Sequence, residues 1–233
     1  MAAWTRIPLP ANRTDVRRRH MDALKAGLAQ RIFAWALARF NKRYEQFVSN
    51  YKRQLFAGIR GTVLELGAGT GANLRYMPPE QVRWTGVELN PFMTSYLRRE
   101  ANRVNLPVSM LIAPADTLPV RDSSVDAVIS TLVLCCVPSP QRCLQDVLRV
   151  LKPGGKFLFI EHVAAPQGSR LRRIQNLVTP GWKRLGDGCH PNRQTLGDIE
   201  AAGFESVSYR EITAPTPIVS PQIAGVAAKA RPV

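Results

Sequence analysis

The chain has 233 residues, a hydrophobic content of 45% and a formal net charge of +15. These values fit one globular α/β domain with an extension, and the charge predicts anionic partners such as a membrane surface, a nucleic acid or an acidic substrate. No stretch reaches the roughly 18 apolar residues of a bilayer-spanning helix, and no secretory signal is recognisable. A reducing cytoplasm is therefore the expected location.

Most of the positive charge lies near the N-terminus. Residues 1–60 carry 13 lysines and arginines against three acidic residues, a net +10. Residues 1–14 show no periodicity, whereas residues 16–56 place apolar side chains three and four positions apart, which predicts a basic amphipathic helix. Such a helix either lies on an anionic membrane or covers an active site, or it packs on the domain with a solvated basic face. Residues 1–56 are expected to form an N-terminal extension.

From residue 62 onward, strand and helix signals alternate. The expected strands are residues 62–66, 82–89, 107–113, 125–136 and 156–163, and the expected helices are residues 70–76, 91–104, 140–151 and 192–202. This alternation predicts a parallel sheet covered by helices on both faces. Residues 164–191 break the rhythm with proline and glycine, and the segments at 204–211 and 219–229 indicate a terminal antiparallel hairpin. We expect a doubly wound α/β domain at 57–233, with an insertion at about 164–195.

The sequence ELGAGTG at residues 65–71 lies where the first strand hands over to a helix. Glycines at such a turn let the backbone approach a ligand closely and present amide groups to it. Gly67, Gly69 and Ala72 satisfy the G-x-G-x-x-G/A dinucleotide fingerprint, which alone is weak evidence for a nicotinamide cofactor. Asn73, in the first turn of that helix, is expected to face solvent rather than the ligand.

Three acidic residues follow three successive strands. Glu65 ends the first strand, Glu88 ends the second and Asp116 follows the third. Because the carboxyl ends of parallel strands meet at one edge of the sheet, a ligand lying across that edge would meet all three acids. An acid at the position of Glu88 can accept hydrogen bonds from a ribose diol.

Together these segments resemble the class I S-adenosylmethionine-dependent methyltransferases over roughly residues 45–230. The matching motifs are ELGAGTG (65–71), VELN (87–90), APADTLP (113–119), DAVIST (126–131) and LKPGGK (151–156). The resemblance implies a Rossmann-like, seven-stranded, mostly parallel sheet with an antiparallel last strand, and S-adenosyl-L-methionine as the cofactor. A dehydrogenase would explain the glycine turn and Glu88, but it explains Asp116 and the turn at 152–155 less well.

The resemblance also implies a set of cofactor-binding residues. They are Glu65, Gly67, Ala68, Gly69, Gly71, Glu88, Leu89, Ala115, Asp116, Thr131 and Leu132. In this family pattern Glu65 lies near the methionine amino group, Glu88 binds the ribose hydroxyls and Asp116 lies near the adenine amino group. Thr131 and Leu132 line the route to the methyl group. The amides at the start of the helix after the glycine turn are expected to face the methionine carboxylate.

Three further segments resemble the methyltransferase-like 7 branch, which includes membrane-associated alkyl thiol S-methyltransferases. They are STLVLCCV (130–137), FIEHVAAP (159–166) and WKRLGDGCHPNRQT (182–195). The resemblance implies methyl transfer to a small hydrophobic acceptor, with a thiol favoured. Membrane-associated members carry an apolar N-terminal anchor, whereas this chain has a basic amphipathic segment, so peripheral contact with an anionic membrane is expected instead of insertion.

The methyl group of a sulfonium is already electrophilic, so the protein must mainly orient the acceptor and exclude water. A thiol needs little help to lose its proton, whereas a phenol or amine needs a base. We expect His162 or Asp187 to remove a proton or orient the substrate. The alternative is that Glu161 and His162 hydrogen-bond the backbone and hold the loop that follows.

The four cysteines give no metal-binding spacing. Cys135 and Cys136 are expected to point to opposite faces of a strand, and Cys189 is expected to pack in the interior. Asp187, Cys189 and His190 lie close in sequence but lack a fourth ligand, so no metal is predicted.

Other functions remain open at this stage. The acceptor could be a phenol, quinone or phospholipid head group methylated on oxygen, nitrogen or carbon, or the chain could be a binding module without catalysis. RNA methylation is less favoured, because residues 131–134 are apolar and no stacking platform is apparent.

Overall fold

The computed structural model describes residues 27–231 of the chain. Its helices are α2 (Leu28–Phe40), α3 (Lys42–Phe56), α4 (Thr94–Arg103), α5 (Pro140–Val150), α6 (Arg170–Leu185) and α7 (Thr195–Glu200), with 3-10 helices η1 (Leu74–Tyr76) and η2 (Pro91–Met93). Its strands are β1 (Gly61–Leu66), β2 (Val82–Val87), β3 (Val108–Leu111), β4 (Val125–Thr131), β5 (Leu151–His162), β6 (Ser206–Thr213) and β7 (Pro221–Ala228). The predicted arm and the first part of the predicted helix at 16–56 lie outside the described residues. Within residues 27–231, no helix combines the length and the apolar content needed to cross a membrane.

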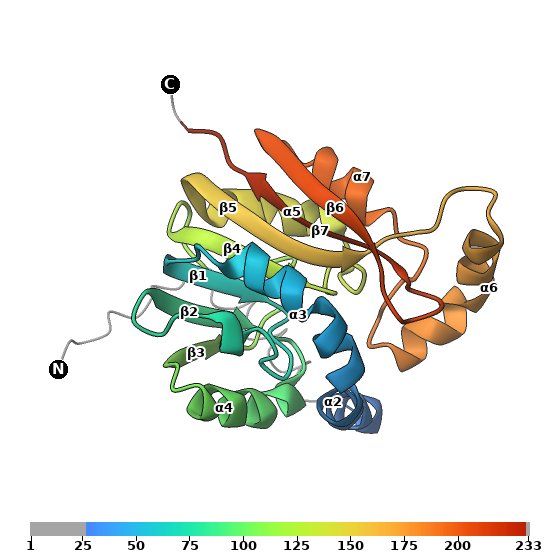
Figure 1. Ribbon diagram of the computed structural model, residues 1–233, viewed down its shortest axis with the longest axis horizontal. Helices are drawn as coiled ribbons and strands as arrows, with labels where there is room; N and C mark the ends of the chain where they lie inside the picture. The colour runs from blue at the N-terminus through green and yellow to red at the C-terminus, as the bar shows by residue number, and fades with distance from the viewer. Residues whose placement is uncertain (1–26, 232–233) are drawn as a thin grey trace.

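The seven strands form one sheet in the order β3-β2-β1-β4-β5-β7-β6 (Figure 1). Neighbouring strands run parallel from β3 to β5, whereas β7 runs antiparallel to both β5 and β6. The pair β6–β7 is the predicted terminal hairpin, in which Tyr209 lies opposite Gly225. The doubly wound, mostly parallel sheet predicted from the sequence is confirmed.

The central strands supply two hydrophobic cores, because successive side chains of a strand point to opposite faces. Leu64 of β1 and Val128 of β4 belong to the core under α5 and α7, whereas Val63 and Ile129 belong to the core under α3 and α4. Burial from both sides explains why β1 and β4 are almost continuously buried along their length. Figure 1 shows α3 in front of the sheet and α5 behind it.

The strand β4 is shorter than the predicted strand at 125–136, because the chain turns away from the sheet after Thr131. Leu132 has a φ of +57°, in the left-handed region that few L-residues adopt. The buried carboxylate of Glu161 accepts hydrogen bonds from the backbone amides of Val133 at 3.0 Å and Leu134 at 3.2 Å. Glu161 therefore holds the loop after β4, whereas the alternative interpretation expected it to hold the loop that follows its own strand.

The same turn corrects the expectation for two cysteines. Cys135 and Cys136 do not lie on a strand; they lie in the loop after β4, and their sulfur atoms are 3.5 Å apart.

The predicted helix at 70–76 is reduced to the three residues of η1. Gly71 has a φ of +82°, which is incompatible with an α-helix, and Met77 is already extended before Pro78. The expectation of an α-helix at this turn is therefore wrong, and the orientation of its amides toward the methionine carboxylate stays a prediction.

Two other segments differ from the prediction. The predicted helix at 16–56 divides into α2 and α3 at Asn41. The segment at 164–191, predicted to be irregular, contains α6, although Pro180 lies inside this helix. The buried side chain of Gln175 fastens α6 by accepting from the amide of Ala165 and donating to the carbonyl of Ile218, both at 2.9 Å.

Candidate active site

A cavity of about 390 Å³ lies across the carboxyl ends of the central strands. The chain continues from β3, on one side of β1, to β4 on the other side, and this reversal leaves a crevice at the carboxyl edge of the sheet. The predicted site residues that line the cavity are Glu65, Gly67, Ala68, Gly69, Glu88, Leu89, Ala115, Thr131, Leu132, His162 and Asp187. Segments from the ends of five strands therefore meet at one site.

The extension before the sheet covers this cavity. Gln30, Phe33 and Leu37 of α2 and Tyr44 of α3 line it. Tyr44 is buried, and its hydroxyl donates a hydrogen bond of 2.9 Å to Gln222 Oε1 on β7. The sequence left open whether the basic amphipathic segment lies on a membrane, covers the active site or packs with a solvated face. The lining residues of α2 and α3 support the interpretation that it covers the site.

The glycine turn shapes one wall of the cavity. Gly67 and Gly69 have φ values of +52° and +53°, which glycine adopts at little cost. A Cβ atom on Gly67 would lie 2.6 Å from a methyl group of Val133. Gly71 does not line the cavity; a Cβ there would lie 2.9 Å from Leu74 Cδ1, so its role is close packing beside α4.

Glu88 occupies the end of β2 and holds two backbone segments together. Its Oε2 accepts from the amide of Gly69 and its Oε1 accepts from the amide of Asn90, each at 2.8 Å. A carboxylate has about four acceptor positions, so each oxygen keeps one for a ligand. Burial raises the pKa of Glu88. The geometry suits two hydroxyl donors, as the assignment to a ribose diol requires.

Glu65 is buried at the end of β1 and has two side-chain donors. Its Oε1 accepts from Asn73 Nδ2 and its Oε2 accepts from Trp84 Nε1, both at 3.0 Å. Burial raises the pKa of Glu65 to about 7. A cationic group placed beside this carboxyl would favour its ionised form.

Asn73 is a site residue that the sequence analysis assigned to solvent, and the structure buries it. Its Nδ2 donates to Glu65 and, at 3.1 Å, to Thr131 Oγ1. Its Oδ1 is buried without a hydrogen-bond partner in the described part of the chain, and the residue lines the cavity. A buried unpaired acceptor is costly unless a ligand supplies a donor.

Lys52 and Glu45 are further lining residues that the sequence analysis missed. Lys52 belongs to the basic pattern at 16–56, for which a solvated face was one of the interpretations left open, but its side chain is fully buried. Its Nζ lies 2.8 Å and 2.9 Å from the two carboxylate oxygens of Glu45. Burial lowers the pKa of Lys52, while Glu45 opposes that shift. These two charges lie behind the glycine turn, next to Glu65.

The segment after β3 contributes Ala113, Pro114 and Ala115 to the cavity. Asp116 follows directly but does not line it, and it is only half-buried. Its assignment to the adenine amino group stays a prediction.

The wall near the end of β4 is largely apolar. Its lining residues include Leu132, Val133, Val137, Pro138, Trp182 and Val219. Such a lining is typical of a pocket for a small hydrophobic ligand with few polar groups.

Sulfur and imidazole groups gather at this apolar wall. His162 Nε2 lies 3.1 Å from Cys189 Sγ, and the ligand atoms of Cys135, His162 and Cys189 all lie within 4.8 Å of one another. The thiols of Cys135 and Cys136 hydrogen-bond Cys189 and, with His162, lower its pKa against the effect of burial. Positions 135, 162 and 189 are far apart in the sequence and meet only in the folded protein. The spacing of the cysteines therefore does not reveal the cluster.

Asp187, the other predicted catalytic residue, lies at the exposed rim of the cavity and not in this cluster. Its φ is +50°, and the side chains of Asn90 and Gln30 hydrogen-bond it. Partial burial raises the pKa of Asp187, and the negative charge of Asp187 in turn contributes to the raised pKa of Glu88. Asp187 is therefore placed to orient groups near Glu88.

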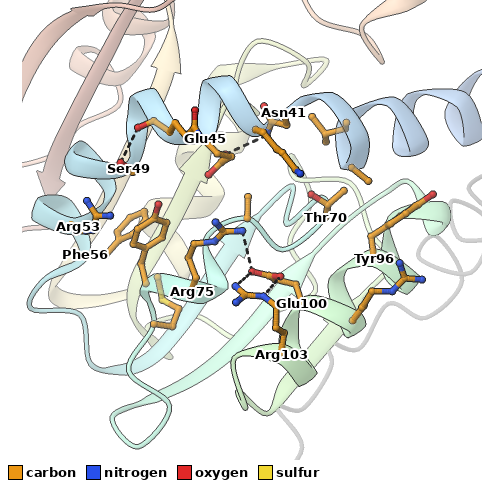
Figure 2. Close-up of a pocket in the computed structure, with 18 of the residues that line it drawn as sticks. Asn41, Glu45, Ser49, Arg53, Phe56, Thr70, Arg75, Tyr96, Glu100 and Arg103 are labelled. Carbon is orange, nitrogen blue, oxygen red and sulfur yellow. Dashed lines mark hydrogen bonds and ion pairs between the residues drawn. The ribbon is translucent and has the colours of Figure 1, made fainter.

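A larger groove of about 1270 Å³ lies on the other side of the glycine turn, between α3 and α4. Figure 2 shows Arg75 and Arg103 directed at Glu100, whose carboxylate they bind at 3.2 Å and 2.6 Å. The predicted site residues do not line this groove. Its open, charged surface contrasts with the apolar cavity, which we take as the active site.

The sheet order, the cavity at the switch point and the acids at Glu65 and Glu88 define a class I S-adenosylmethionine-dependent methyltransferase. A methyltransferase domain family matches residues 64–159. The chain is 39% identical to thiol S-methyltransferase TMT1B of Rattus norvegicus over 87% of this chain and 88% of the relative. It is 34% identical to thiol S-methyltransferase TMT1A of Homo sapiens over the same shares. The chain belongs to this thiol S-methyltransferase family.

A solved structure supports the fold independently. The SAM-dependent methyltransferase from Thermotoga maritima has a TM-score of 0.56 and 21% identity, covering 84% of this chain and 99% of that chain.

Proposed function

We propose that this protein transfers the methyl group of S-adenosyl-L-methionine to the sulfur atom of a small hydrophobic thiol, leaving S-adenosyl-L-homocysteine. The observation that carries the proposal is the apolar wall of the cavity, with its imidazole and thiol cluster. An apolar wall suits a small hydrophobic acceptor better than a nucleic acid. Relatives named as thiol S-methyltransferases support sulfur as the accepting atom.

The polar residues of the cavity fit the cofactor. The free acceptor positions of Glu88 suit the ribose hydroxyls, and the unpaired Oδ1 of Asn73, beside Glu65, suits an ammonium group. Lys52 is the cation on this side of the cavity that suits a carboxylate. When bound, the cofactor supplies a methyl group on a positively charged sulfur, which a nucleophile attacks without further activation.

The acceptor thiol must lose its proton, and the site must keep water away from the reacting sulfur. We assign proton removal to the pair of His162 and Cys189, whose Nε2 and Sγ atoms lie 3.1 Å apart at the cavity wall. Phe33 and Leu37 of α2 close the space from the other side and keep it apolar. Asp187, at the rim, orients the bound molecule through its contacts with Gln30 and Asn90.

Matched acceptors test the accepting atom. The purified protein is given S-adenosyl-L-methionine and an alkyl thiol, the alcohol of the same carbon skeleton, a phenol, an amine or a quinol, and kcat/KM is measured for each. We expect the thiol to exceed the alcohol by at least about 100-fold, because only the thiol forms an anion readily near neutral pH. Preferred turnover of the phenol, quinol or amine would replace the thiol assignment. Intact cofactor binding without turnover of any acceptor would indicate a binding module.

We also propose that the outer face of α2 contacts an anionic membrane. Leu28, Ile32 and Trp35 recur at helical spacing and are 72%, 54% and 53% exposed. The adjoining Arg31 and Arg39 are also exposed. Apolar side chains beside arginines complement an anionic lipid surface, and the inner face of the same helix lines the cavity that would receive a hydrophobic acceptor.

Vesicle sedimentation tests this contact. We expect the protein to bind phosphatidylcholine vesicles that contain phosphatidylserine more strongly than vesicles without it, and Trp35→Ser to reduce that binding. Exposed Leu177→Ser on α6 is the matched control, because this residue is 81% exposed on a different helix. Equal binding to both vesicle types, or unchanged binding by Trp35→Ser, would contradict the proposal.

A further inference from the structure

The cluster at the cavity wall brings together three potential metal ligands whose spacing in the sequence does not predict a metal site. Cys135 comes from the loop after β4, His162 ends β5 and Cys189 follows α6. Cys135 and His162 are buried and Cys189 is 9% exposed, and one ligand atom of each residue lies within 4.8 Å of the other two. Two thiolates and one imidazole are the ligands that zinc prefers, and three protein ligands with one open position are typical of a catalytic zinc site.

The distances suit an ion at the centre of the cluster. Zinc binds sulfur at about 2.3 Å and nitrogen at about 2.0 Å, so tetrahedral ligands lie roughly 3.5 to 3.8 Å apart. The gap of 3.1 Å between His162 and Cys189 is slightly shorter than this, and the other separations lie at or below 4.8 Å. Small rotations of three side chains would close the set around an ion.

The lining of the cavity indicates that the cluster is not simply core packing. All three residues line the cavity rather than the hydrophobic cores of the sheet, and Cys136, whose sulfur is 3.5 Å from Cys135 Sγ, lines it as well.

We propose that Cys135, His162 and Cys189 bind one zinc ion whose fourth position faces the cavity and takes the acceptor thiol. This inference rests on the proposed function, because it places the ion at the acceptor end of the same cavity, and it departs from the prediction of no metal. Coordination forms a zinc–sulfur bond and releases the thiol proton to solvent. In the metal-loaded protein, the ion then replaces the His162–Cys189 pair as the group that stabilises the acceptor thiolate.

Metal content and cobalt spectroscopy test the site without any activity measurement. The full chain is stripped with a chelator and reloaded with Zn²⁺ or Co²⁺, and bound metal is counted by mass spectrometry. We expect one equivalent, with a tetrahedral visible band and a sulfur-to-cobalt charge-transfer band for Co²⁺. Cys135→Ser and Cys189→Ser should weaken metal binding by at least about tenfold and should lose intensity in the charge-transfer band.

Matched controls make each outcome decisive. Cys143→Ser changes a buried cysteine of α5 outside the cluster, and Cys136→Ser changes the neighbouring thiol; both should retain one equivalent of metal. Adding an alkyl thiol should shift the cobalt spectrum if the fourth position is open. Failure of the wild-type protein to bind one equivalent, or equal binding by Cys189→Ser in a variant that melts cooperatively, would overturn the site. Loss of metal from Cys136→Ser would overturn the open position.

The two proposals fail separately. Thiol methylation by the chelator-treated protein at the full rate would retain the proposed function and overturn the role of zinc in it. Stoichiometric metal without thiol turnover would retain the site and overturn the acceptor.

Discussion

Among single residues, Glu88 joins the glycine turn to the next strand and keeps two acceptor positions for a ligand. Replacing Glu88 with alanine should weaken S-adenosyl-L-methionine binding at least about tenfold, because two hydrogen bonds to a charged group are lost. Isothermal titration calorimetry measures the change, and Glu80→Ala, at an exposed acid before β2, is the control. Equal affinities for the two variants would sink the ribose assignment.

Glu65 gives cofactor binding a pH dependence. Its pKa is raised from 4.5 to about 7 by burial, so the free protein holds a proton there between these values. Between about pH 4.5 and 7 the carboxyl is protonated in the folded protein and ionised in the unfolded chain. The free energy of unfolding of the ligand-free protein therefore falls as the pH rises through this range, by a total on the order of 3 kcal/mol at pH 7 and above. A bound ammonium group favours the ionised form, so affinity should rise several-fold from pH 5.5 to 7.5.

Proton release measures this coupling directly. Calorimetry near pH 6 in two buffers with different ionisation enthalpies should show net proton release on cofactor binding, and Glu65→Gln should abolish it. Absence of release by the wild-type protein would mean that the cationic group binds elsewhere.

The predictability of the site differs from residue to residue. Glu65 and Glu88 are recognisable in sequence because an acid ends an apolar strand beside a glycine turn. Lys52 and Asn73 are not, because α3 buries them by packing over the turn, and a lysine in a basic amphipathic pattern predicts a solvated face. Cys135 and Cys189 meet His162 only through the turn after β4 and the end of α6, which no local spacing encodes.

Among the structural elements, the loop after β4 depends on one buried carboxylate. Glu161 accepts hydrogen bonds from Ser130 Oγ and from the amides of Val133 and Leu134. Glu161→Ala leaves these donors unpaired and should destabilise the fold by about 3 to 5 kcal/mol. Thermal unfolding followed by circular dichroism measures the loss, and Glu200→Ala on the exposed side of α7 should melt like the wild type. A melting temperature unchanged by Glu161→Ala would refute this role of the carboxylate.

The helix α2 presents different faces to the cavity and to solvent. Leu37 lines the cavity, whereas Ile32 is 54% exposed. Leu37→Ala should raise KM for a hydrophobic thiol several-fold, because it removes apolar contact area, while Ile32→Ala should leave KM in vesicle-free solution unchanged. Steady-state kinetics with one alkyl thiol compares the two. Equal effects would show that α2 acts on the acceptor indirectly.

The bounds of secondary-structure elements were predicted well for strands that are buried on both faces of the sheet. They were predicted poorly where tertiary contacts override the local sequence pattern. The strands β1 and β2 were expected close to their observed positions, because apolar runs between turns mark buried parallel strands. The strand β5 was expected at 156–163, but it begins at Leu151 and includes the predicted turn at 152–155. The end of β4 was misplaced, because Glu161 bends an apolar run out of the sheet. The helix α6 was missed, because Pro180 and Gly181 lie within it and indicate a break.

At the scale of the whole molecule, one edge of the sheet and the helical extension enclose the same cavity. The carboxyl ends of the strands place Glu65, Glu88 and the cluster around His162 in one cavity, and α2 and α3 close it. A methyl group on a charged sulfur and a thiol acceptor would then meet in a space with an apolar wall, as transfer to sulfur requires. We propose that both molecules react in this cavity.

Transfer of an isotopically labelled methyl group tests that claim most directly. The protein is incubated with S-adenosyl-L-methionine labelled with deuterium in its methyl group and with one alkyl thiol, and the products are identified by mass spectrometry. We predict the labelled methyl thioether and S-adenosyl-L-homocysteine in equal amounts, with both products strongly reduced by Glu88→Ala. Cofactor binding with no labelled thioether, or label appearing only on oxygen, nitrogen or carbon acceptors, would contradict the account.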